Sequence, residues 1–447
     1  DVPIAHLEEL PRARIIFLDE NGIGANIVNA LMDLPGETMI VSPGIKFQVA
    51  GNRFRINPKN ADDYTQFVRV LQSRGIEIGQ VIHLWSTNCG PETVQRADDV
   101  MEHQYFGVYS LFFLFKAFHQ CHKFPRFSLK VVASNMIQLN PGEVCWGVPS
   151  ATLIGFVKSL THEYPHVKAE LIDVNRDRMS VAEIANAILA RLSYEPVAPL
   201  VALRKGEVWT QKIVKVDETA VDQSPSRKSR KGGVYLVTGG TGGIGLELTR
   251  ALSKHFAPGS KFVLLNRSPF PPREKWKEII RLAGDTDPLV EKLRIIEEIE
   301  QESSETITLQ VDITKEKDLD EALRFIRERY GPINGVVHAA GTHKDSLVVN
   351  KNELDMKRVL EAKVKGTIIL DQLTRQDPLE FFVICSSVAS IFGGVGQSDY
   401  SAANSFVDQY THYRNGMVQR RTLTLNWSLW HNVGMARSSE ATSGLVR

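Results

Sequence analysis

Four polar residues in the second half of the chain have side chains that can donate, accept or orient a proton. Lys363 precedes Ser387 by 24 positions, Ser387 precedes Tyr400 by 13, and Asn404 follows Tyr400 by four. When a ketone receives a hydride, its oxygen gains alkoxide character, so a proton donor and a hydrogen bond must converge on it. A phenol and a hydroxyl are suitable donors. Each of these residue types is more often structural when it occurs alone. The prediction of a chemical site therefore depends on the four residues occurring together.

A glycine-rich loop lies upstream of these four residues. Gly239, Gly243 and Gly245 have the spacing G-x-x-x-G-x-G, in which missing side chains let the backbone approach a pyrophosphate at the start of a helix. The apolar run Val234–Val237 precedes the loop and the helically spaced run Leu246–Phe256 follows it, which is the context that the motif requires. We predict a dinucleotide-binding loop rather than a purely structural turn, made of Thr238, Gly239, Gly240, Thr241, Gly242, Gly243, Ile244 and Gly245.

The residues after the next expected strand, Lys261–Leu265, bear on the choice of cofactor. A NAD-binding domain presents a carboxylate there to the ribose 2′-hydroxyl, but this chain has Asn266-Arg-Ser268. The guanidinium of Arg267 suits a 2′-phosphate, and Ser268 can add a hydroxyl donor. NADPH is therefore predicted over NADH, with a surface arginine that has no ligand as the alternative.

Two further groups of residues follow later strands. Asp312 and Ile313 could contact the adenine amine, and the small residues Ala339, Ala340 and Gly341 would let the nicotinamide ribose lie close to the backbone. A helix-capping aspartate and a tight turn would have the same sequence, so these alternatives stay open.

Alternating strands and helices in the second half predict a parallel sheet with helices on both faces. Beyond the two strands already named, we expect strands at Ile307–Val311, Gly335–His338, Phe381–Cys385 and Thr422–Asn426.

The first half repeats this order in weaker form. Strands are expected at Ile15–Leu18, Val81–Trp85 and Val131–Ser134. Pro149–Phe156 then takes the place of Asp399–Phe406, with a serine at the position of the tyrosine and an isoleucine at that of the asparagine. Unless the similarity of the halves is chance, the first half keeps the scaffold without the chemistry.

Two segments lie outside this alternation. Ser224–Gly233 has the composition of a solvated linker, which predicts a structural subdomain over residues 1–230 and a catalytic one over 231–447. Its basic cluster, Arg227 to Lys231, could instead bind a polyanion. Pro269–Glu305 is a long, heavily charged excursion that we expect to be a disordered or solvated helical insertion rather than a binding element.

The composition is that of a globular protein with more than one core. Across 447 residues, 53 Lys and Arg balance 52 Asp and Glu, so no overall field favours nucleic acid or a membrane surface. No apolar run approaches membrane-spanning length. The cysteines lack the spacing of a metal site or a disulfide framework, so we expect no metal and a reducing, cytoplasmic setting. Without an initiator methionine or a natural end, the chain is expected to be a piece of a longer protein.

Several motifs together resemble the short-chain dehydrogenase/reductase superfamily, and within it the ketoreductase domain of modular polyketide synthases. They are Thr238–Gly245, Val336–Gly341, Ser386-Ser387, Tyr400-x-x-x-Asn404 and Asn426-Trp-Ser-Leu-Trp430. In most of the superfamily a lysine follows the tyrosine by four residues. Here the asparagine has that position and Lys363 lies upstream, as in the polyketide and fatty-acid synthase branch. The resemblance covers essentially the whole chain and implies that the first half is a truncated, inactive copy of the same fold.

The resemblance implies a role for each of the four polar residues. Tyr400 would donate the proton and Ser387 would orient the carbonyl. Lys363 would lower the phenol pKa from its ordinary value of about 10 and bond the nicotinamide ribose, and Asn404 would hold a water that resupplies the proton. The register disfavours two competing candidates, Ser386 and Lys365.

Two positions bear on stereochemistry through the same resemblance. In this family a Leu-Asp-Asp motif after the Ala-Ala-Gly turn accompanies a D-hydroxy product, and a tryptophan eight residues before the tyrosine accompanies an L-hydroxy product. Here the first motif is His343-Lys-Asp345, which keeps only its last aspartate, and the second position is Phe392. A D-configured product is expected, with a plain surface loop as the alternative explanation of His343–Asp345.

The activity that these features imply is NADPH-dependent reduction of the β-keto group of an acyl thioester, carried on the phosphopantetheine of an acyl carrier protein. Expected partners are that carrier and neighbouring synthase domains, with no nucleic acid and no membrane. A groove beside Gly393–Gly396 would admit the phosphopantetheine arm, and the residues after Met435 would help to form the acyl pocket.

The subtype and two alternatives complete the prediction. The long excursion, and two subdomains without an inserted enoylreductase, resemble bacterial synthases that use free-standing acyltransferases. The nearer alternative is a fatty-acid-synthase-like or stand-alone ketoacyl reductase. The further one is a non-catalytic scaffold that binds NADPH or carrier protein.

Overall fold

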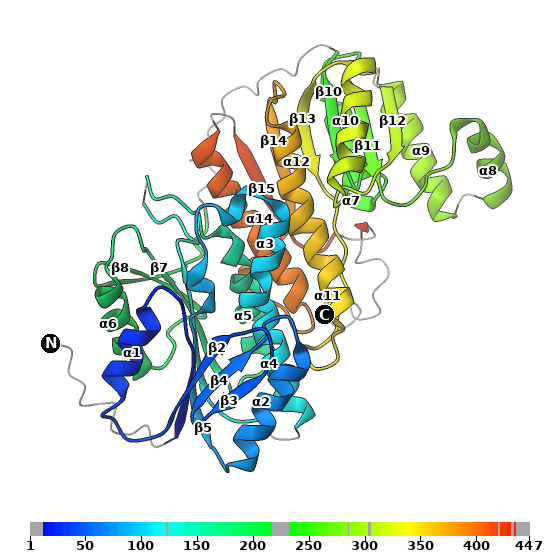
Figure 1. Cartoon of the computed structure of the whole chain (residues 1–447). Helices are drawn as coiled ribbons and strands as arrows, with labels where there is room; N and C mark the ends of the chain where they lie inside the picture. Colours follow the sequence, from blue (N-terminus) through cyan, green and yellow to red (C-terminus); the bar gives the residue numbers. More distant parts are fainter. Residues whose placement is uncertain are drawn as a thin grey trace. The chain divides into compact units, whose positions relative to one another are not determined.

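The computed structural model describes residues 12–121, 124–140, 142–216, 232–284, 286–302, 305–418, 421–430 and 433–434 (Figure 1). Two predictions fall outside these residues: the linker before Gly232 with its basic cluster, and the acyl-pocket segment after Met435. The described residues form two compact units. Unit 1 comprises the described residues of Asp1–Ile213, Lys344–Leu360 and Ala389–Tyr413, and unit 2 comprises those of Val214–His343, Glu361–Val388 and Arg414–Arg447.

The two units do not coincide with the two halves of the sequence. Lys344–Leu360 and Ala389–Tyr413 belong to the second half, yet both fold as part of unit 1. Unit 1 therefore contains Tyr400 and Asn404, whereas unit 2 contains Lys363 and Ser387. The division near residue 230 stays a prediction about the repeat in the sequence.

Unit 1 is built on a nine-stranded sheet of order β3-β4-β2-β1-β5-β6-β7-β8-β9. All neighbours from β4 to β8 are parallel, and β3 and β9 pair antiparallel at the two edges. The strands are β1 Ala13–Phe17, β2 Thr38–Pro43, β3 Gln48–Ala50, β4 Arg53–Ile56, β5 Ile78–His83, β6 Ser128–Ser134, β7 Lys168–Val174, β8 Leu200–Arg204 and β9 Glu207–Thr210.

Helices cover both faces of this sheet. They are α1 Ile23–Leu31, α2 Ala61–Ser73, α3 Ala97–His103, α4 Val108–Gln120, α5 Thr152–Glu163 and α6 Val181–Leu192, with α11 Glu353–Leu360, α13 Ala389–Phe392 and most of α14 Ser398–Met417 from the second half. α1 packs against α6, and α2 packs against α4 on the opposite face (Figure 1). Ile27 and Ile188 bring the first pair onto the buried side chains of the strands, while α4 is apolar on nearly all sides and buried accordingly.

Unit 2 is built on a six-stranded, wholly parallel sheet of order β12-β11-β10-β13-β14-β15. Its strands are β10 Val234–Thr238, β11 Lys261–Asn266, β12 Glu305–Gln310, β13 Ile333–His338, β14 Phe381–Ser387 and β15 Thr422–Trp427. In unit 1 the run β4-β2-β1-β5-β6-β7 has the same pattern, the doubly wound order in which the chain reverses direction beside the first strand. The predicted fold class, two Rossmann-like parallel-sheet subdomains, is confirmed.

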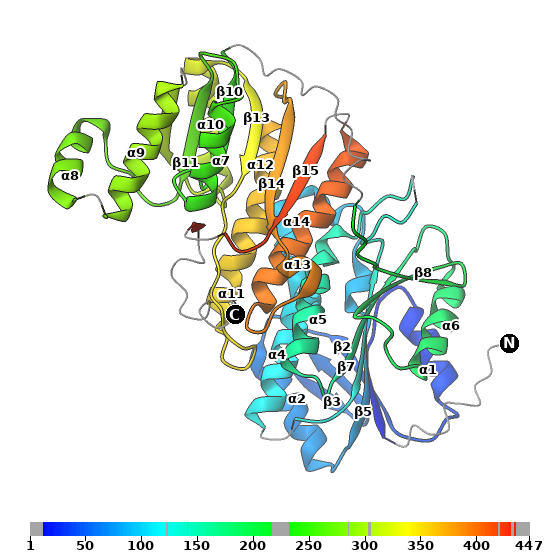
Figure 2. The ribbon, with the colours of Figure 1, turned by 180° about the vertical axis from the view of Figure 1, so that it is seen from behind.

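The helices of unit 2 include one correction to the sequence prediction. They are α7 Gly243–Ser253, α8 Trp276–Ala283, α9 Pro288–Gln301, α10 Glu316–Tyr330 and α12 Gly366–Thr374. α9 packs against α7 and lies beside β12 (Figure 1, Figure 2). Its residues Leu293, Ile296 and Ile299 are fully buried in the core. The expected helical character of Pro269–Glu305 agrees with α8 and α9, but the expectation that the segment is disordered or wholly solvated is wrong. The charges of α9 lie on one side of the helix, and its other side is apolar and buried.

Within the described ranges, no helix is long and apolar enough to cross a lipid bilayer. In the same residues, no group of three or more His, Cys, Asp and Glu side chains is arranged to hold a metal ion.

Candidate active site

The glycine loop of unit 2 turns between β10 and α7 at the carboxyl edge of the sheet. Gly239 has φ +64°, and a Cβ atom there would lie 2.9 Å from the backbone of Ala340. A Cβ on Gly245 would lie 2.4 Å from the carbonyl oxygen of Gly239. Larger residues would push the loop open, so both positions require glycine.

Neighbouring backbone and one side chain fix the loop. The N–H of Gly239 donates to the carbonyl of Leu265 at 2.8 Å, and that of Gly242 donates to the carbonyl of Gly239 at 2.9 Å. The N–H of Thr241 donates to Oδ1 of Asn266 at 2.8 Å. The first turn of α7 contains no acidic residue. A helix start of this kind, close to the backbone and without a protein carboxylate, fits a pyrophosphate.

The corresponding loop of unit 1 already contains an anion. Asp19 follows β1 and is buried. Its carboxylate accepts the N–H of Gly24 at 2.6 Å, that of Ile23 at 3.1 Å and that of Asn21 at 3.0 Å. The protein's own carboxylate thus takes the place at the start of α1 that a phosphate would need. The sequence analysis missed this residue, although an aspartate directly after the first strand was a visible signal.

Arg267 and Ser268 lie where the prediction requires them, directly after β11. β10 and β11 are parallel neighbours, so their carboxyl ends lie at the same edge of the sheet. Both side chains are exposed. The backbone is held by Nε2 of Gln310, which donates to the carbonyl of Arg267 at 3.2 Å. An exposed guanidinium beside the glycine loop is compatible with the predicted contact to a 2′-phosphate.

Asp312 and Ile313 each have a structural contact. Oδ1 of Asp312 accepts the N–H of Thr314 at 3.1 Å and its hydroxyl at 2.7 Å. Ile313 is buried, and its Cδ1 lies 2.9 Å from where a Cβ on Gly366 would be. These contacts resemble the capping alternative, and the adenine contact stays a prediction.

Thr238 joins β10 to the end of β13. Its Oγ1 lies 2.6 Å from Nδ1 of His338 and accepts the N–H of Ala340 at 3.3 Å. Both side chains are fully buried. Burial, with a smaller effect from the charge of Lys363, lowers the pKa of His338 to about 3, so its imidazole is neutral at physiological pH. The turn Ala339–Gly341 is therefore anchored by a hydrogen-bonded Thr–His pair that the sequence analysis did not single out.

Lys363 lies in a single π-helical turn, Glu361–Lys365, between α11 and α12. Such turns occur frequently at functional sites. Its side chain is buried, and Nζ donates to the carbonyl of Cys385 near the end of β14. A Cβ on Gly341 would lie 2.9 Å from Cε of this lysine, so the absence of a side chain at Gly341 makes room for that of Lys363. The structure thus brings Lys363, the Ala-Ala-Gly turn and the end of β14 together, whereas Lys365 is only half-buried.

The two neighbouring serines at the end of β14 differ in exposure. Ser386 is buried, and Nδ2 of Asn426 lies 3.4 Å from its hydroxyl. Ser387 is half-buried, and its carbonyl accepts from the same amide at 3.4 Å. The greater exposure of Ser387 agrees with the register argument that favoured it.

Tyr400 and Asn404 lie one turn apart in the first part of α14. Nδ2 of Asn404 donates to the carbonyl of Tyr400 at 2.8 Å. The N–H of Tyr400 donates to Oδ1 of Asp399, also at 2.8 Å. Asn404 is fully buried and Tyr400 is half-buried. Both residues are held in unit 1, on a helix that packs so closely that a Cβ on Gly155 of α5 would lie 2.1 Å from the carbonyl of Ser401.

The two predicted stereochemical positions also belong to unit 1. Oδ2 of Asp345 accepts from Nε2 of Gln397 at 2.9 Å. Phe392 is 56% exposed, and its carbonyl lies 2.8 Å from Nε2 of His162. A Cβ on Gly393 would lie 2.8 Å from the backbone of Lys158. Gly393 therefore serves close packing on α5, and the predicted groove beside Gly393–Gly396 remains a prediction.

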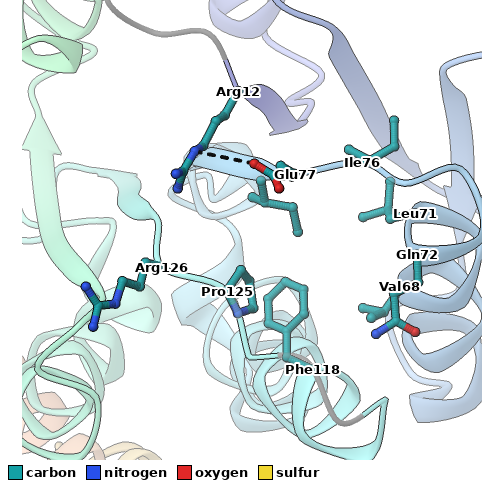
Figure 3. Close-up of a pocket in the computed structure, with 10 residues that line it drawn as sticks. Arg12, Val68, Leu71, Gln72, Ile76, Glu77, Phe118, Pro125 and Arg126 are labelled. Atoms are coloured by element: carbon teal, nitrogen blue, oxygen red, sulfur yellow. Dashed lines mark ion pairs between the residues drawn. The ribbon is translucent and has the colours of Figure 1, made fainter.

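A separate cavity of about 210 Å³ lies in unit 1 (Figure 3). Its wall is largely apolar, with Leu71 and Phe118 on it, and an ion pair between Arg12 and Glu77 lies at one side. Its residues precede β1, β5 and β6 or lie on α2 and α4. It is thus at the amino ends of the strands, the edge opposite the one where doubly wound sheets bind ligands.

Both units have a doubly wound α/β fold. The first turn of α7 in unit 2 contains no acidic residue, whereas the corresponding place in unit 1 is filled by the carboxylate of Asp19. Residues 233–432 match the family model described as "KR domain", and residues 13–191 match the one described as "Beta-ketoacyl synthase-like, N-terminal". Residues 233–432 are therefore a ketoreductase (KR) domain, and the chain is similar to the ketoreductase domains of modular polyketide synthases.

Several relatives place this domain inside much larger proteins. Polyketide synthase PksN of Bacillus subtilis (strain 168) is 30% identical over 300 residues, which are 66% of this chain and 5% of that protein. The 6-methylsalicylic acid synthase of Penicillium expansum is 26% identical over 304 residues, 67% of this chain and 16% of that protein. The chain thus spans only a small part of the curated relatives that it matches.

A solved structure extends the similarity to both halves. The N-terminal ketoreductase from the macrolactin assembly line has a TM-score of 0.78 and 26% identity, and the match covers 95% of this chain and 80% of that one. A multidomain structure that includes a ketoreductase, from a keto acid-selecting NRPS module, has a TM-score of 0.83 over 97% of this chain and 35% of that one. Its identity is 24%, so it supports the fold alone. Unit 1 is therefore part of the ketoreductase fold.

Proposed function

We propose that the chain reduces the β-keto group of an acyl chain held as a phosphopantetheine thioester on an acyl carrier protein, with NADPH as the reductant. The contrast between two helix starts carries this proposal. α7 begins without a carboxylate behind a glycine loop, whereas Asp19 fills the equivalent place before α1. The glycine loop before α7 would thus be a dinucleotide cradle and the loop before α1 a closed version of it, and the four polar residues follow only the former.

The residues of unit 2 suit NADPH. We propose that the glycine loop holds the pyrophosphate, that Arg267 and Ser268 bind the 2′-phosphate, and that the Ala339–Gly341 turn lies along the nicotinamide ribose. Bound there, the cofactor would supply the hydride. The adenine contact of Asp312 and Ile313 belongs to the same proposal.

The four polar residues would donate and position the proton. Tyr400 would give its phenolic proton to the oxygen that forms as the carbonyl is reduced, and Ser387 would hydrogen-bond that oxygen. Lys363, buried against the Gly341 turn, would favour the phenolate and bond the ribose. Asn404 would hold a water that resupplies the proton.

Four finer points belong to the proposal. The product is D-configured, with Asp345 and Phe392 beside the substrate. Residues 1–230 are the structural subdomain and 231–447 the catalytic one, with two segments of the latter folded onto the former. The parent synthase is a bacterial one that uses free-standing acyltransferases. The setting is a reducing cytoplasm, in keeping with four cysteines that are all free.

A second candidate function follows from the ketoacyl-synthase-like match of residues 13–191. A condensing activity there would need a reactive thiol or comparable nucleophile. Burial raises the pKa of Cys89 and of Cys145 to about 12, which suppresses the thiolate. These two buried cysteines are therefore poor candidates for such a nucleophile.

The decisive experiment follows NADPH oxidation with a simple β-ketoacyl thioester, first as the N-acetylcysteamine ester and then on a carrier protein. We expect turnover in the native chain, loss of it in Tyr400→Phe, and retention in Tyr413→Phe, which removes the same hydroxyl from the same helix. Activity unchanged in Tyr400→Phe would refute the assignment. NADPH binding without turnover in the native chain would favour a scaffold. Equal kcat/KM on free and carrier-bound substrates would favour a stand-alone reductase.

A further inference from the structure

Lys351 is a fully buried lysine of unit 1 that does not belong to the proposed catalytic set. Nζ donates to Oδ1 of Asp399 at 2.8 Å, to the carbonyl of Lys344 at 3.0 Å and to that of Gly396 at 3.3 Å. An ammonium has three protons to donate, and three acceptors surround this one. The two paired side chains are 0% and 1% exposed.

The partner of this lysine is bonded to the backbone of the proposed acid. Oδ1 of Asp399, the atom that faces Lys351, also accepts the N–H of Tyr400 at 2.8 Å. Asp399 and Tyr400 lie together in the first turn of α14. The charge of Lys351 therefore fixes the carboxylate that in turn holds the amide of Tyr400.

The same cluster joins the two loops that carry the stereochemical positions. The N–H of Ser346 donates to the carbonyl of Gly396 at 2.9 Å. Glu163, at the end of α5, accepts the N–H of Val348 at 2.8 Å and that of Gly396 at 3.0 Å. Asp345 lies directly before one of these bonds, and Phe392 lies directly before the loop that contains the others. Any shift in this cluster would thus change the position of the loops around a substrate bound near Asp345.

A buried ion pair is weak evidence of a contribution to stability, since removing two charges from water costs about as much as their attraction returns. What a buried ion pair contributes specifically is a fixed arrangement of the segments that it joins. Here the geometry links Tyr400, the loop 344–351 and the loop 393–397 through two charged side chains and one glutamate.

We infer that Lys351, Asp399 and Glu163 are positioning residues that set Tyr400 relative to the Asp345 loop and so determine which face of the keto group is reduced. The inference rests on the proposed function, because it takes Tyr400 to be the acid. None of the three touches a reacting atom. They act through the backbone of Tyr400 and through the placement of the two loops.

The test compares Lys351→Met, which keeps the length of the side chain and removes its charge, with a matched control. Lys130→Met breaks the pair Lys130–Glu170, which is equally buried at 0% exposure for both side chains and has an N–O distance of 2.9 Å. Three quantities are measured on the full chain: NADPH affinity, kcat on a β-ketoacyl thioester, and the ratio of D- to L-hydroxy product by chiral chromatography.

In Lys351→Met we expect NADPH affinity to stay at the native value, since the cofactor residues lie in unit 2, and kcat to fall about 10- to 100-fold. The product ratio should move toward a mixture. In Lys130→Met any loss of stability should leave the product ratio unchanged. If Lys351 had a purely structural role, the product ratio would stay native in both variants or would change equally in Lys351→Met and Lys130→Met.

Two further variants keep the inference testable if Lys351→Met does not fold. Asp399→Asn keeps an acceptor for the N–H of Tyr400 and removes the charge, and Glu163→Gln does the same for the loop contacts. Both should shift the product ratio toward a mixture of D- and L-hydroxy product. A native product ratio and kcat in these variants, with Tyr400→Phe inactive, would overturn the inference and leave the reductase assignment intact. An active Tyr400→Phe would instead remove the proposed function on which the inference depends.

Discussion

Asp19 holds Gly24 through a hydrogen bond of 2.6 Å from the backbone N–H of the glycine to the carboxylate, and the same carboxylate binds two further N–H groups at the start of α1. A nucleotide could bind at the start of α7 in unit 2. In unit 1 the equivalent place at the start of α1 is filled by the buried side chain of Asp19. This difference gives a physical reason why the proposed cofactor would bind at the start of α7 and not at the start of α1.

Replacing Asp19 by Ala should destabilise unit 1. The variant leaves three N–H groups without their acceptor, and hydrogen bonds to a charged group are worth about 1.5–3 kcal/mol. We expect the free energy of unfolding in urea to fall by about that amount, with kcat per folded molecule unchanged. Asp33→Ala, at an exposed aspartate after α1, is the control and should have almost no effect. Equal stability of the two variants would contradict a role for the Asp19 contacts.

Gly245→Ala should abolish cofactor binding. Its new methyl group would lie 2.4 Å from the carbonyl oxygen of Gly239, and backbone cannot yield as a flexible side chain can. We expect NADPH binding, measured by the fluorescence of the reduced nicotinamide, to weaken beyond detection. Gly416→Ala, in α14, would place its methyl group more than 4 Å from every atom other than its chain neighbours and the backbone of its own helix. This variant should retain affinity and gain up to about 1 kcal/mol of stability. Native affinity in Gly245→Ala would show that the loop does not carry the cofactor.

Arg267→Ala should weaken NADPH and leave NADH unchanged. A charge-assisted contact of about 1.5–3 kcal/mol corresponds to about a 10- to 150-fold rise in the KM for NADPH. The selectivity is found by measuring kcat/KM for both cofactors. Arg281→Ala, at another exposed arginine of unit 2, controls for the loss of a surface charge. A parallel loss for NADPH and NADH would argue against the 2′-phosphate contact.

Acid sensitivity should decrease in His338→Asn. Burial lowers the folded-state pKa of His338 to about 3, below the ordinary unfolded value of about 6.5, so acid favours the unfolded chain. The stability tied to the neutral imidazole is complete above pH 6.5 and is lost as the pH falls toward 3. Between pH 8 and 5 the native chain should lose about 2 kcal/mol through this group, and the variant should not.

The measurement is the free energy of unfolding in urea at pH 8, 6.5 and 5. At pH 8 the variant should differ from the native chain only by the constant cost of its altered contact with Thr238. His83 and His103, also buried with lowered pKa values, remain in both proteins and cancel in the comparison. Identical pH profiles would refute the assignment to His338.

Patterns local in the sequence predicted most of the fold. The strands around Val234–Val237, Phe381–Cys385 and Val131–Ser134 were placed within a few residues, because apolar runs bounded by glycine and polar residues depend on neighbours in the chain. The helical character of Pro269–Glu305 was predicted, but the burial of α9 was not. Its charges are conspicuous in the sequence, whereas its apolar side is recognised only when it packs into the core of unit 2.

By itself the sequence determined the type of protein: the glycine spacing before α7, the Arg267 position, and the order of Lys363, Ser387, Tyr400 and Asn404 all depend on residue type and interval alone. Tertiary structure decided which distant segments of the chain come into contact, because spacing along the sequence does not contain that information. It grouped Ala389–Tyr413 with the first half of the chain, closed the first helix start with Asp19, and paired Lys351 with Asp399 across 48 positions. A buried charge finds its partner through the packing of distant segments, so only the folded chain shows which lysine orders the loops around Tyr400.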